Sequence, residues 1–382
     1  TPYSRGGDGK SPVGPVVREY LVSEAMHHLG VPTTRALAAI ATGDPVYRSY
    51  QEPGAVLVRV AKSHLRFGSI QYFAMTKDGE GLAELVSYAA DRHFADSVLA
   101  KNAQTVEAKA EILLEETVKR IATLIAQWQS LGFVHGVMNT DNMLLSGETI
   151  DYGPCAFIDT FKADAKFSAI DTQGRYRLSN QPGIAHWNTS VLASCLLKVL
   201  NTKEEAAVAY AQTVVDEFPS WYTTAYKSQI AAKLGLDAFR PDDTQLHDQF
   251  LTVLERDALD HTLAYRWLVH EALQDSGHTP IGELFTPSDG LRSWVKDWQL
   301  RRADNNVENS ETAGKMQHAN PVVIPRNHQV AEAIARAETG DYGYLQSAFE
   351  RWQQPYEWQD QDSNWAATPE PSERVHQTFC GT

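Results

Sequence analysis

Asp141, Asn142 and Asp151 form the densest group of residues in the chain that could do chemistry. Asp141 and Asn142 are adjacent, and Asp151 opens the triplet Asp151-Tyr152-Gly153 after a short apolar segment. A carboxylate beside a carboxamide, followed by a second aspartate, supplies the hard oxygen ligands that Mg²⁺ prefers, and such sites usually share the metal with phosphates. The pattern therefore indicates phosphate chemistry at a metal. The alternative is a polar turn in which Asp and Asn bond only to nearby backbone groups.

Protein kinases carry similar parts in the same order. They have a catalytic-loop Asp, an Asn that binds metal, and the Asp of an Asp-Phe-Gly triplet that also binds metal. The triplet alone is weak, because it recurs at Asp341-Tyr342-Gly343 without a metal partner before it. The longer arrangement, which begins at His135, is more specific and favours a kinase-like site over a plain turn.

Three charged residues in the N-terminal part could complete such a site. Glu19 lies in the first predicted helix, where a kinase-like site needs a glutamate that holds a lysine. Arg59 lies in a Val-rich strand and Arg66 in the turn after it, and an arginine inside a strand costs desolvation unless it meets an anion. Bidentate binding of phosphate is one use for both arginines. A solvated glutamate and ordinary surface ion pairs are the alternatives.

Gly9-Lys10-Ser11 is similar to the end of a phosphate-binding P-loop, but its context argues against one. The motif needs a glycine five positions before Gly9, where this chain has Ser4, and no strand precedes it. Pro12 and Pro15 also hinder a helix directly behind it. We therefore interpret this segment as a glycine-rich loop.

The composition limits the classes of partner. The chain has 382 residues, of which 43% are hydrophobic and 21% charged, as in folded proteins of two or three domains. Its net charge of −14 repels nucleic-acid backbones and anionic lipid. We find neither an apolar run of about 18 residues nor a signal peptide. The three cysteines form no zinc or disulfide pattern. We expect a cytoplasmic protein without nucleic-acid or membrane partners.

The sequence pattern predicts that α-helices and β-strands together position these residues, which is an α+β fold. Helical spacing predicts helices over residues 16–29, 81–94, 106–131, 184–200, 203–217, 225–234, 243–259, 260–271 and 329–339. Runs rich in Val, Ile and aromatic residues predict strands over residues 35–42, 55–61 and 69–74. Loops are expected over residues 1–14 and 302–319. A helix with strands first and a helical body afterwards predicts two unequal lobes.

Several long segments together resemble the selenoprotein O family, at residues 3–9, 18–26, 30–37, 135–142, 150–154 and 173–176. The resemblance extends over the whole chain. It implies a protein-kinase-like fold, with the remainder of an N-lobe at 1–76, a mainly helical C-lobe at 77–301 and a C-terminal extension at 302–382. It also implies protein adenylylation, in which AMP passes from ATP to a Ser, Thr or Tyr hydroxyl of a protein and pyrophosphate leaves.

The resemblance implies a role for each residue that matches a family motif. Asp141 would be the catalytic base that takes the proton of the acceptor hydroxyl. Asn142 and Asp151 would bind Mg²⁺ or Mn²⁺, and Asp151 would also contact the nucleotide.

Further nucleotide contacts would come from Asp8, Gly9, Arg59 and Arg66, with Glu19 positioning the nucleotide-binding lysine. The family holds ATP reversed relative to kinases, so the arginines would face the leaving pyrophosphate, whose growing charge needs fixed cations.

Two departures from the family pattern affect these expectations. The family's glycine-rich loop and nucleotide-binding lysine would lie before Thr1, so we expect this chain to be a fragment that binds ATP weakly. Loss of a lysine that clamps phosphate typically lowers the reaction rate by roughly 10²–10³. Cys380 resembles a redox-active tail thiol. The partner cysteine of some bacterial members would fall near Phe167. Cys155 is therefore the only nearby alternative, unless it is a buried small side chain.

Two other functions stay open. One is a kinase-like phosphotransferase, against which the arginines argue because they suit a reversed nucleotide. The other is a non-catalytic pseudokinase scaffold, which the missing lysine favours and the retained metal-binding residues oppose.

Overall fold

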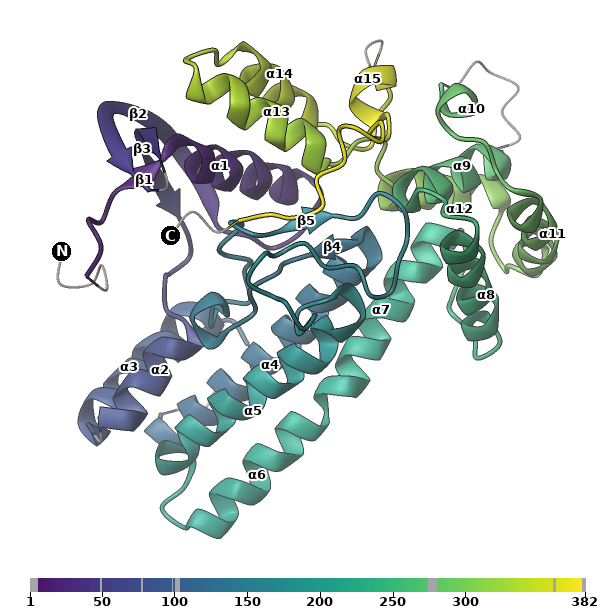
Figure 1. Cartoon of the computed structure of the whole chain (residues 1–382). Helices are drawn as coiled ribbons and strands as arrows, with labels where there is room; N and C mark the ends of the chain where they lie inside the picture. Colours follow the sequence, from purple (N-terminus) through teal and green to yellow (C-terminus); the bar gives the residue numbers. More distant parts are fainter. Residues whose placement is uncertain are drawn as a thin grey trace.

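The computed structural model describes residues 6–48, 50–76, 78–97, 99, 104–273, 280–359 and 362–379 of the chain. The architecture is mixed α+β, with a small antiparallel sheet beside a mostly helical body (Figure 1). The predicted α+β class is thereby confirmed. Among the described residues, no helix combines the length and the apolar character that crossing a membrane requires.

The N-terminal part is one helix packed on a three-stranded sheet. The sheet contains β1 (Ser11–Pro12), β2 (Arg35–Tyr47) and β3 (Gln51–Val60) in the order β1-β3-β2, and α1 (Val13–His28) packs against it. The predicted helix is confirmed but begins at Val13, because Pro15 is tolerated in the first turn of a helix. The predicted strands over 35–42 and 55–61 are confirmed with different bounds.

Three predictions for local structure are wrong. Residues 69–74 belong to a helix, α2 (Phe67–Thr76), whose buried Phe67 and Ile70 are spaced for one helix face. The predicted loop over 302–319 contains α12 (Asn309–Ala319), in which Ala313 and Met316 are buried. The predicted loop over 1–14 contains β1 and the start of α1.

A long helix, α4 (Val106–Leu131), is the centre of the helical body. Its predicted apolar stripe is buried, and α4 packs against α3 (Gly79–Phe94), α5 (Gln181–Leu200) and α7 (Phe218–Leu234). Gly132, with φ +70°, ends α4 in the left-handed conformation that glycine adopts without strain. The chain then enters the short strand β4, so α4 fixes where the candidate site begins.

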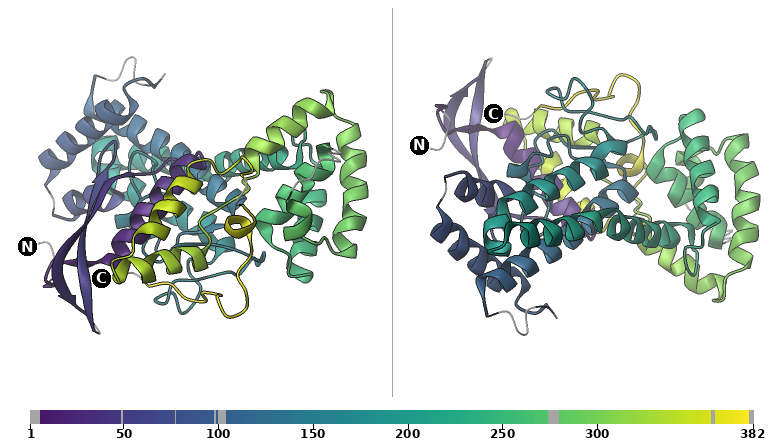
Figure 2. Two further views of the ribbon diagram at one scale, coloured as in Figure 1. Left: turned by 90° about the horizontal axis from the view of Figure 1, so that it is seen from above. Right: turned by 90° about the horizontal axis from the view of Figure 1, so that it is seen from below.

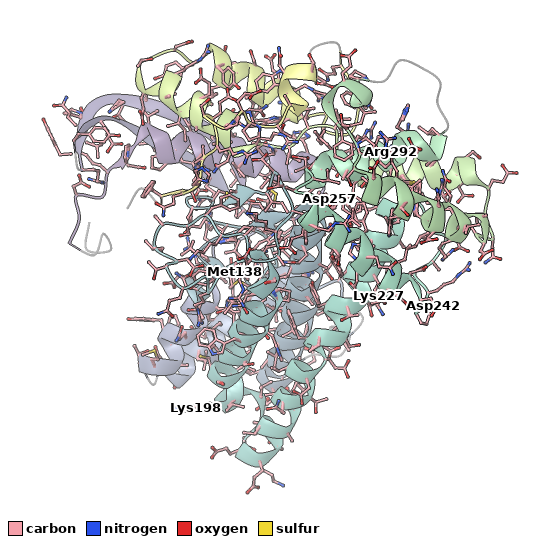
Figure 3. All side chains as sticks on the ribbon, turned by 45° about the vertical axis from the view of Figure 1, so that its right-hand side comes forward. Met138, Lys198, Lys227, Asp242, Asp257 and Arg292 are labelled. Atoms are coloured by element: carbon pink, nitrogen blue, oxygen red, sulfur yellow. The ribbon has the colours of Figure 1, made fainter. Side chains whose placement is uncertain are left out.

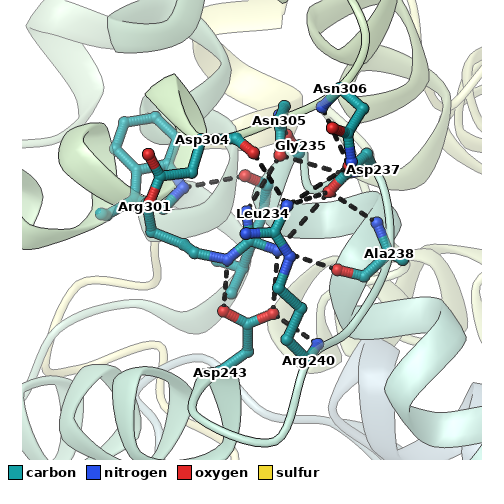
Figure 4. Close-up of polar contacts among 11 residues, drawn as sticks. Leu234, Gly235, Asp237, Ala238, Arg240, Asp243, Arg301, Asp304, Asn305 and Asn306 are labelled. Carbon is teal, nitrogen blue, oxygen red and sulfur yellow. Dashed lines mark hydrogen bonds and ion pairs between the residues drawn. The ribbon is translucent and has the colours of Figure 1, made fainter.

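The remaining helices build the far end of the body and the C-terminal part. They are α6 (Glu204–Asp216), α8 (Asp243–Arg256), α9 (His261–Leu273), α10 (Ile281–Leu284), α11 (Asp289–Ala303), α13 (Asn327–Glu338), α14 (Gly343–Trp352) and α15 (Asp362–Ala366). Figure 2 shows the sheet at one end of the molecule and helices α8, α9, α11 and α12 at the other. An ion-pair network supports that end, where Arg301 Nε lies 2.6 Å from Asp243 Oδ1 (Figure 4).

The C-terminal part returns to the first helix. Both α13 and α14 pack against α1, as Figure 1 also shows. The rings of Tyr20 and Phe349 stack with centroids 5.2 Å apart, and Tyr356 Oη donates to Leu29 O at 2.9 Å. The helix that carries Glu19 is therefore held between the sheet and the last helices of the chain.

Candidate active site

A two-stranded hairpin places the central residues of the candidate site. Strand β4 (Phe133–Val134) pairs with β5 (Ala156–Phe157), so the intervening loop carries Asp141, Asn142 and Asp151. His135 is buried in this loop, where its Nε2 lies 2.9 Å from Ile150 O and its ring stacks on Trp128. Burial lowers the pKa of His135, and its contact with Ile150 O ties the start of the loop to the residue before Asp151.

Asn142 is fixed by the loop that precedes it. It lies in a single 3₁₀ turn, Thr140–Asn142, and its buried amide Nδ2 donates to Val137 O at 2.9 Å. The amide nitrogen is thus used within the loop, which leaves Oδ1 as the end that can bind a cation. The adjoining helix α5 supports the same loop, since Asn188 Nδ2 donates to Met138 O at 3.0 Å; Figure 3 labels Met138 within the body.

Asp141 lies directly against α2. A Cβ atom added to Gly68 would be 2.1 Å from Asp141 Oδ1, so the carboxylate occupies space that any residue other than glycine would fill. Arg66 Nη1 donates to Asp141 O at 2.7 Å. Arg66 also bridges to Leu144 in antiparallel fashion, which fixes the segment before α2 against the loop. Asp141 as a whole is an exposed residue at this junction.

Asp151 has a strained backbone, with φ +69°. This left-handed conformation is uncommon outside glycine, and for Asp it is tolerated because the short side chain can bond locally. Here Gly153 N donates to Asp151 Oδ1 at 3.3 Å. Such strain often occurs at functional sites, where the surrounding structure holds it in place.

Glu19 connects α1, β3 and the Asp151 loop. Its Oε1 accepts from Tyr152 N at 2.8 Å, and its Oε2 lies 2.5 Å from Arg59 Nη2. Burial raises the pKa of Glu19, Arg59 lowers it, and the nearby charge of Asp151 raises it further. Among the residues that the structure describes, Arg59 is the cation that pairs with Glu19.

The two arginines and three carboxylates are close enough to influence one another. Burial lowers the pKa of Arg66, and the charge of Arg59 lowers it further, whereas Asp141, Asp151 and Glu19 act in the opposite direction. Two guanidinium groups near one another are unfavourable unless anions accompany them. Here three carboxylates already accompany the two guanidinium groups, so a polyphosphate would need a bound cation as well.

A cleft of about 620 Å³ lies between α1, the sheet and the Asp151 loop. Its lining includes Gly9, Glu19, Arg59 and Asp151, together with apolar residues of β3 such as Leu57. The volume falls in the range of about 300–1,000 Å³ typical of small-molecule sites. Asp141, Asn142 and Arg66 are not in this lining and lie on the adjoining hairpin loop and the turn before α2.

Asp8, which is also predicted to contact the nucleotide, forms an ion pair with Arg48. Its Oδ2 and Oδ1 accept from Arg48 Nη1 and Nη2 at 3.0 and 3.2 Å, and these bonds lower the pKa of Asp8 to about 2. Asp8 does not line the cleft. Lys10 does, with Nζ 3.7 Å from Asp44 Oδ2. The sequence motifs assign no role to Lys10; its place in the Gly9-Lys10-Ser11 loop is the signal that points to it.

Arg18, the neighbour of Glu19, is a further residue that the sequence did not single out. It is buried, and its Nη1 donates at 3.1 Å both to Cys155 O and to Asn327 Oδ1. Thus α1 holds the 151–155 segment at two points, through Glu19 and through Arg18. An arginine next to a functional glutamate on a helix has no distinctive spacing, so only the structure reveals this role.

The donor set for a cation is small. In the described ranges, no three His, Cys, Asp or Glu side chains are grouped so that they could hold a metal ion. The carboxylate of Asp151 and the amide oxygen of Asn142 are of the donor types that suit a Mg²⁺-type ion, which takes its other ligands from phosphates and water.

The structure describes Cys155 but not the tail cysteine, Cys380. Cys155 is buried and its Sγ donates to Tyr152 O at 3.1 Å, and burial raises the pKa of its thiol to about 12. This agrees with the interpretation of Cys155 as a small buried side chain. Cys380 lies outside the described residues.

Comparison with known proteins gives a consistent result. The family model described as protein adenylyltransferase SelO matches residues 1–353. A protein named protein nucleotidyltransferase YdiU from Geobacillus kaustophilus is 46% identical over 100% of this chain and 76% of its own length. Proteins of the same name from Anoxybacillus flavithermus and Maridesulfovibrio salexigens are 44% and 42% identical with the same coverage. The chain therefore belongs to the SelO family of protein adenylyltransferases.

Proposed function

We propose that this protein transfers AMP from ATP to Ser, Thr or Tyr hydroxyls of other proteins, with pyrophosphate as the second product. The observation that carries the proposal is the cleft in which Glu19, Arg59 and Asp151 meet, with the Asp141 loop beside it. Membership of the SelO family supports the reaction class. We further propose a kinase-like arrangement, with lobes at 1–76 and 77–301 and an extension at 302–382.

The proposed reaction assigns one task to each group. The acceptor hydroxyl oxygen forms a bond to the α-phosphorus of ATP, and the bond from that phosphorus to the β-phosphate oxygen breaks. Asp141 accepts the hydroxyl proton, for which its exposed position is suited. Arg59 and Arg66 stabilise the charge that grows on the departing pyrophosphate.

Asn142 and Asp151 would hold Mg²⁺ or Mn²⁺. When bound, such an ion supplies positive charge that neutralises the transferred group. Gly9 brings backbone to the edge of the cleft, where Lys10 adds a cation. Asp8 acts on this loop indirectly, because Lys10 N donates to its Oδ1 at 3.0 Å.

Glu19 positions other residues rather than reacting itself. It orients Arg59 toward the cleft and fixes Tyr152 N, directly after Asp151. In kinases the corresponding glutamate pairs with a lysine; in the part of the chain that the structure describes, Glu19 pairs with Arg59.

The test follows the label from two forms of ATP. The full-length gene product is incubated with Mg²⁺ or Mn²⁺, acceptor proteins, and ATP labelled at either the α- or the γ-phosphate. We expect label in protein from the α position only. Label from the γ position only would overturn the proposal in favour of a phosphotransferase.

The chain offers a matched control for the metal-binding aspartate. Asp341 opens a second Asp-Tyr-Gly triplet, and Gly343 N donates to its Oδ1 at 3.0 Å, like Gly153 N to Asp151. Asp151→Ala should abolish transfer of the α-label, whereas Asp341→Ala should leave it unchanged. Equal activity of the two variants would show that the assignment of Asp151 is wrong.

A further inference from the structure

A second cleft, of about 430 Å³, lies apart from the candidate active site. Its lining comes from three parts of the chain, at residues 158–167, 258–263 with 284–286, and 368–376. Figure 1 shows the C-terminal segment, in yellow, running back along the segments that surround β5. None of these lining residues belongs to the lining of the first cleft.

The floor of this cleft is apolar and its rim is cationic. Ile158, Leu263 and Phe285 on the floor are buried, whereas Lys162 and Arg374 are exposed. Lys166 and His376 also line it. A cluster of cations stands out in a chain whose net charge is −14. A floor of this kind takes an apolar body, and the rim takes an anion.

The two carboxylates in the lining, Asp159 and Asp260, share one buried arginine. Asp260 accepts from Arg326 Nη1 at 2.8 Å and from Arg326 Nη2 at 3.2 Å, and Asp159 Oδ1 also binds Arg326 Nη1. Arg326 itself is buried and is not part of the lining. One arginine balances one of these two charges, so a single net negative charge remains opposite the rim residues Lys162, Lys166 and Arg374.

The rim cations have no anionic partner in the described part of the chain. Lys166 Nζ donates to Thr172 O at 2.8 Å, which fixes its place without neutralising its charge. Neither the side chain of Lys162 nor that of Arg374 has a hydrogen bond or an ion pair to any residue that the structure describes. Lysine and arginine side chains in this state are suited to bind phosphate.

We propose that this cleft binds a small organic phosphate, with the phosphate at the Lys162 and Arg374 rim and the apolar body on the floor. The ligand would bridge two segments that already meet nearby. Thr378 N donates to Phe167 O at 2.8 Å, Ala169 N donates to Thr378 O at 3.0 Å, and Thr378 Oγ1 donates to Pro154 O. Because Pro154 follows the Asp151 loop, occupancy favours the conformation in which the tail holds that loop.

The proposal is tested by calorimetric titration with AMP, adenosine and pyrophosphate. The titration uses the full-length protein carrying Arg59→Ala, which weakens binding in the first cleft. We expect AMP to bind this variant, and adenosine, which has no phosphate, to bind at least tenfold more weakly. Undetectable binding of AMP at millimolar concentration overturns the proposal. Binding of pyrophosphate without AMP overturns the assignment of an organic ligand.

Two further variants in the same background locate the site. Lys162→Ala with Arg374→Ala should lower AMP affinity at least tenfold, and Thr286→Trp should do so by filling the cleft from its exposed rim. The charge-matched control, Lys198→Ala with Arg292→Ala, removes two exposed cations elsewhere that Figure 3 labels, and should bind AMP unchanged. If both double variants behave alike, the proposal is wrong.

Discussion

Glu19 Oε1 accepts a hydrogen bond from Tyr152 N at 2.8 Å while Glu19 Oε2 holds Arg59 Nη2 at 2.5 Å. One carboxylate thus joins the first helix, strand β3 and the loop of Asp151. Its side chain is 14% exposed and that of Arg59 is 22% exposed, so water screens this pair less than a surface pair. Arg59 and Asp151 consequently keep their relative places through Glu19.

Replacing Glu19 should separate its two tasks. Glu19→Ala leaves Arg59 and Tyr152 N without their acceptor, and we expect a loss of about 1–3 kcal/mol in the free energy of unfolding. ATP affinity should fall roughly tenfold, which corresponds to about 1.4 kcal/mol. Glu19→Gln can still accept from Tyr152 N and should lose less stability. Urea denaturation measures the stability and ATP titration measures the affinity. An unchanged ATP affinity in Glu19→Ala would contradict the role of Glu19 in positioning Arg59 and the Asp151 loop.

Arg18 should affect kcat of the proposed AMP transfer, because it holds the 151–155 segment in place. Arg18→Met removes the donor to Cys155 O and Asn327 Oδ1, and we expect about 1–3 kcal/mol lower stability. Because the 151–155 segment gains freedom, kcat should fall more than KM rises. The surface control Arg336→Ala breaks an exposed pair with Glu332 and should change stability by less than about 1 kcal/mol. A variant of Arg18 with normal kcat would show that this contact is only structural.

Gly68→Ala should reduce activity without destabilising the fold. The added Cβ would lie 2.1 Å from Asp141 Oδ1, so the carboxylate that we propose as the base must move. Gly68 is the second residue of α2 and its φ is outside the left-handed region, so the backbone itself accepts alanine. Gly314→Ala in α12 is the matched control, because its Cβ would meet nothing within 4 Å. Thermal unfolding and label transfer measure the two effects; full activity of Gly68→Ala would exclude the proposed place of Asp141.

Lys233 should make stability depend on pH. It is buried over the ring of Tyr265 at 4.2 Å, with only a 3.5 Å contact to Ala319 O, and burial lowers its pKa from 10.5 to about 7. Between these values the unfolded chain binds more protons, so stability rises with pH by up to about 1.4 kcal/mol per unit.

The variant Lys233→Met tests this dependence. It removes the buried amine, so it should raise stability at pH 7 and flatten the rise between pH 7 and 10. The exposed control Lys198→Met should keep that rise. Urea denaturation at several pH values is the measurement, and an unchanged rise in Lys233→Met would assign the pH dependence to other groups.

Several parts of the fold could be predicted because their signals are local. The apolar stripe of α4 repeats at helical spacing over many turns, and Gly132 marks its end. The hairpin that carries Asp141 and Asp151 is flanked by apolar runs at β4 and β5. By contrast, the short apolar run at 69–74 fits a strand or a helix equally well. It forms part of helix α2, in which Phe67 and Ile70 are buried.

The contacts of the candidate site could not be predicted, because they join distant parts of the chain. The Glu19–Arg59 pair depends on how α1 lies across β3, and the contact of Gly68 with Asp141 depends on how α2 meets the hairpin loop. The resemblance assigned roles to residue types but not partners. It therefore did not show that Asp8 binds Arg48 or that Lys10 lines the cleft.

The most direct test of the proposed function is the mass of the modified acceptor protein after incubation of the full-length enzyme with ATP and Mg²⁺ or Mn²⁺. The proposal predicts the addition of AMP on a hydroxyl side chain, with one pyrophosphate released for each AMP transferred. The modification should be lost in Asp151→Ala and retained in Asp341→Ala. Addition of a phosphoryl group with release of ADP would contradict the proposal.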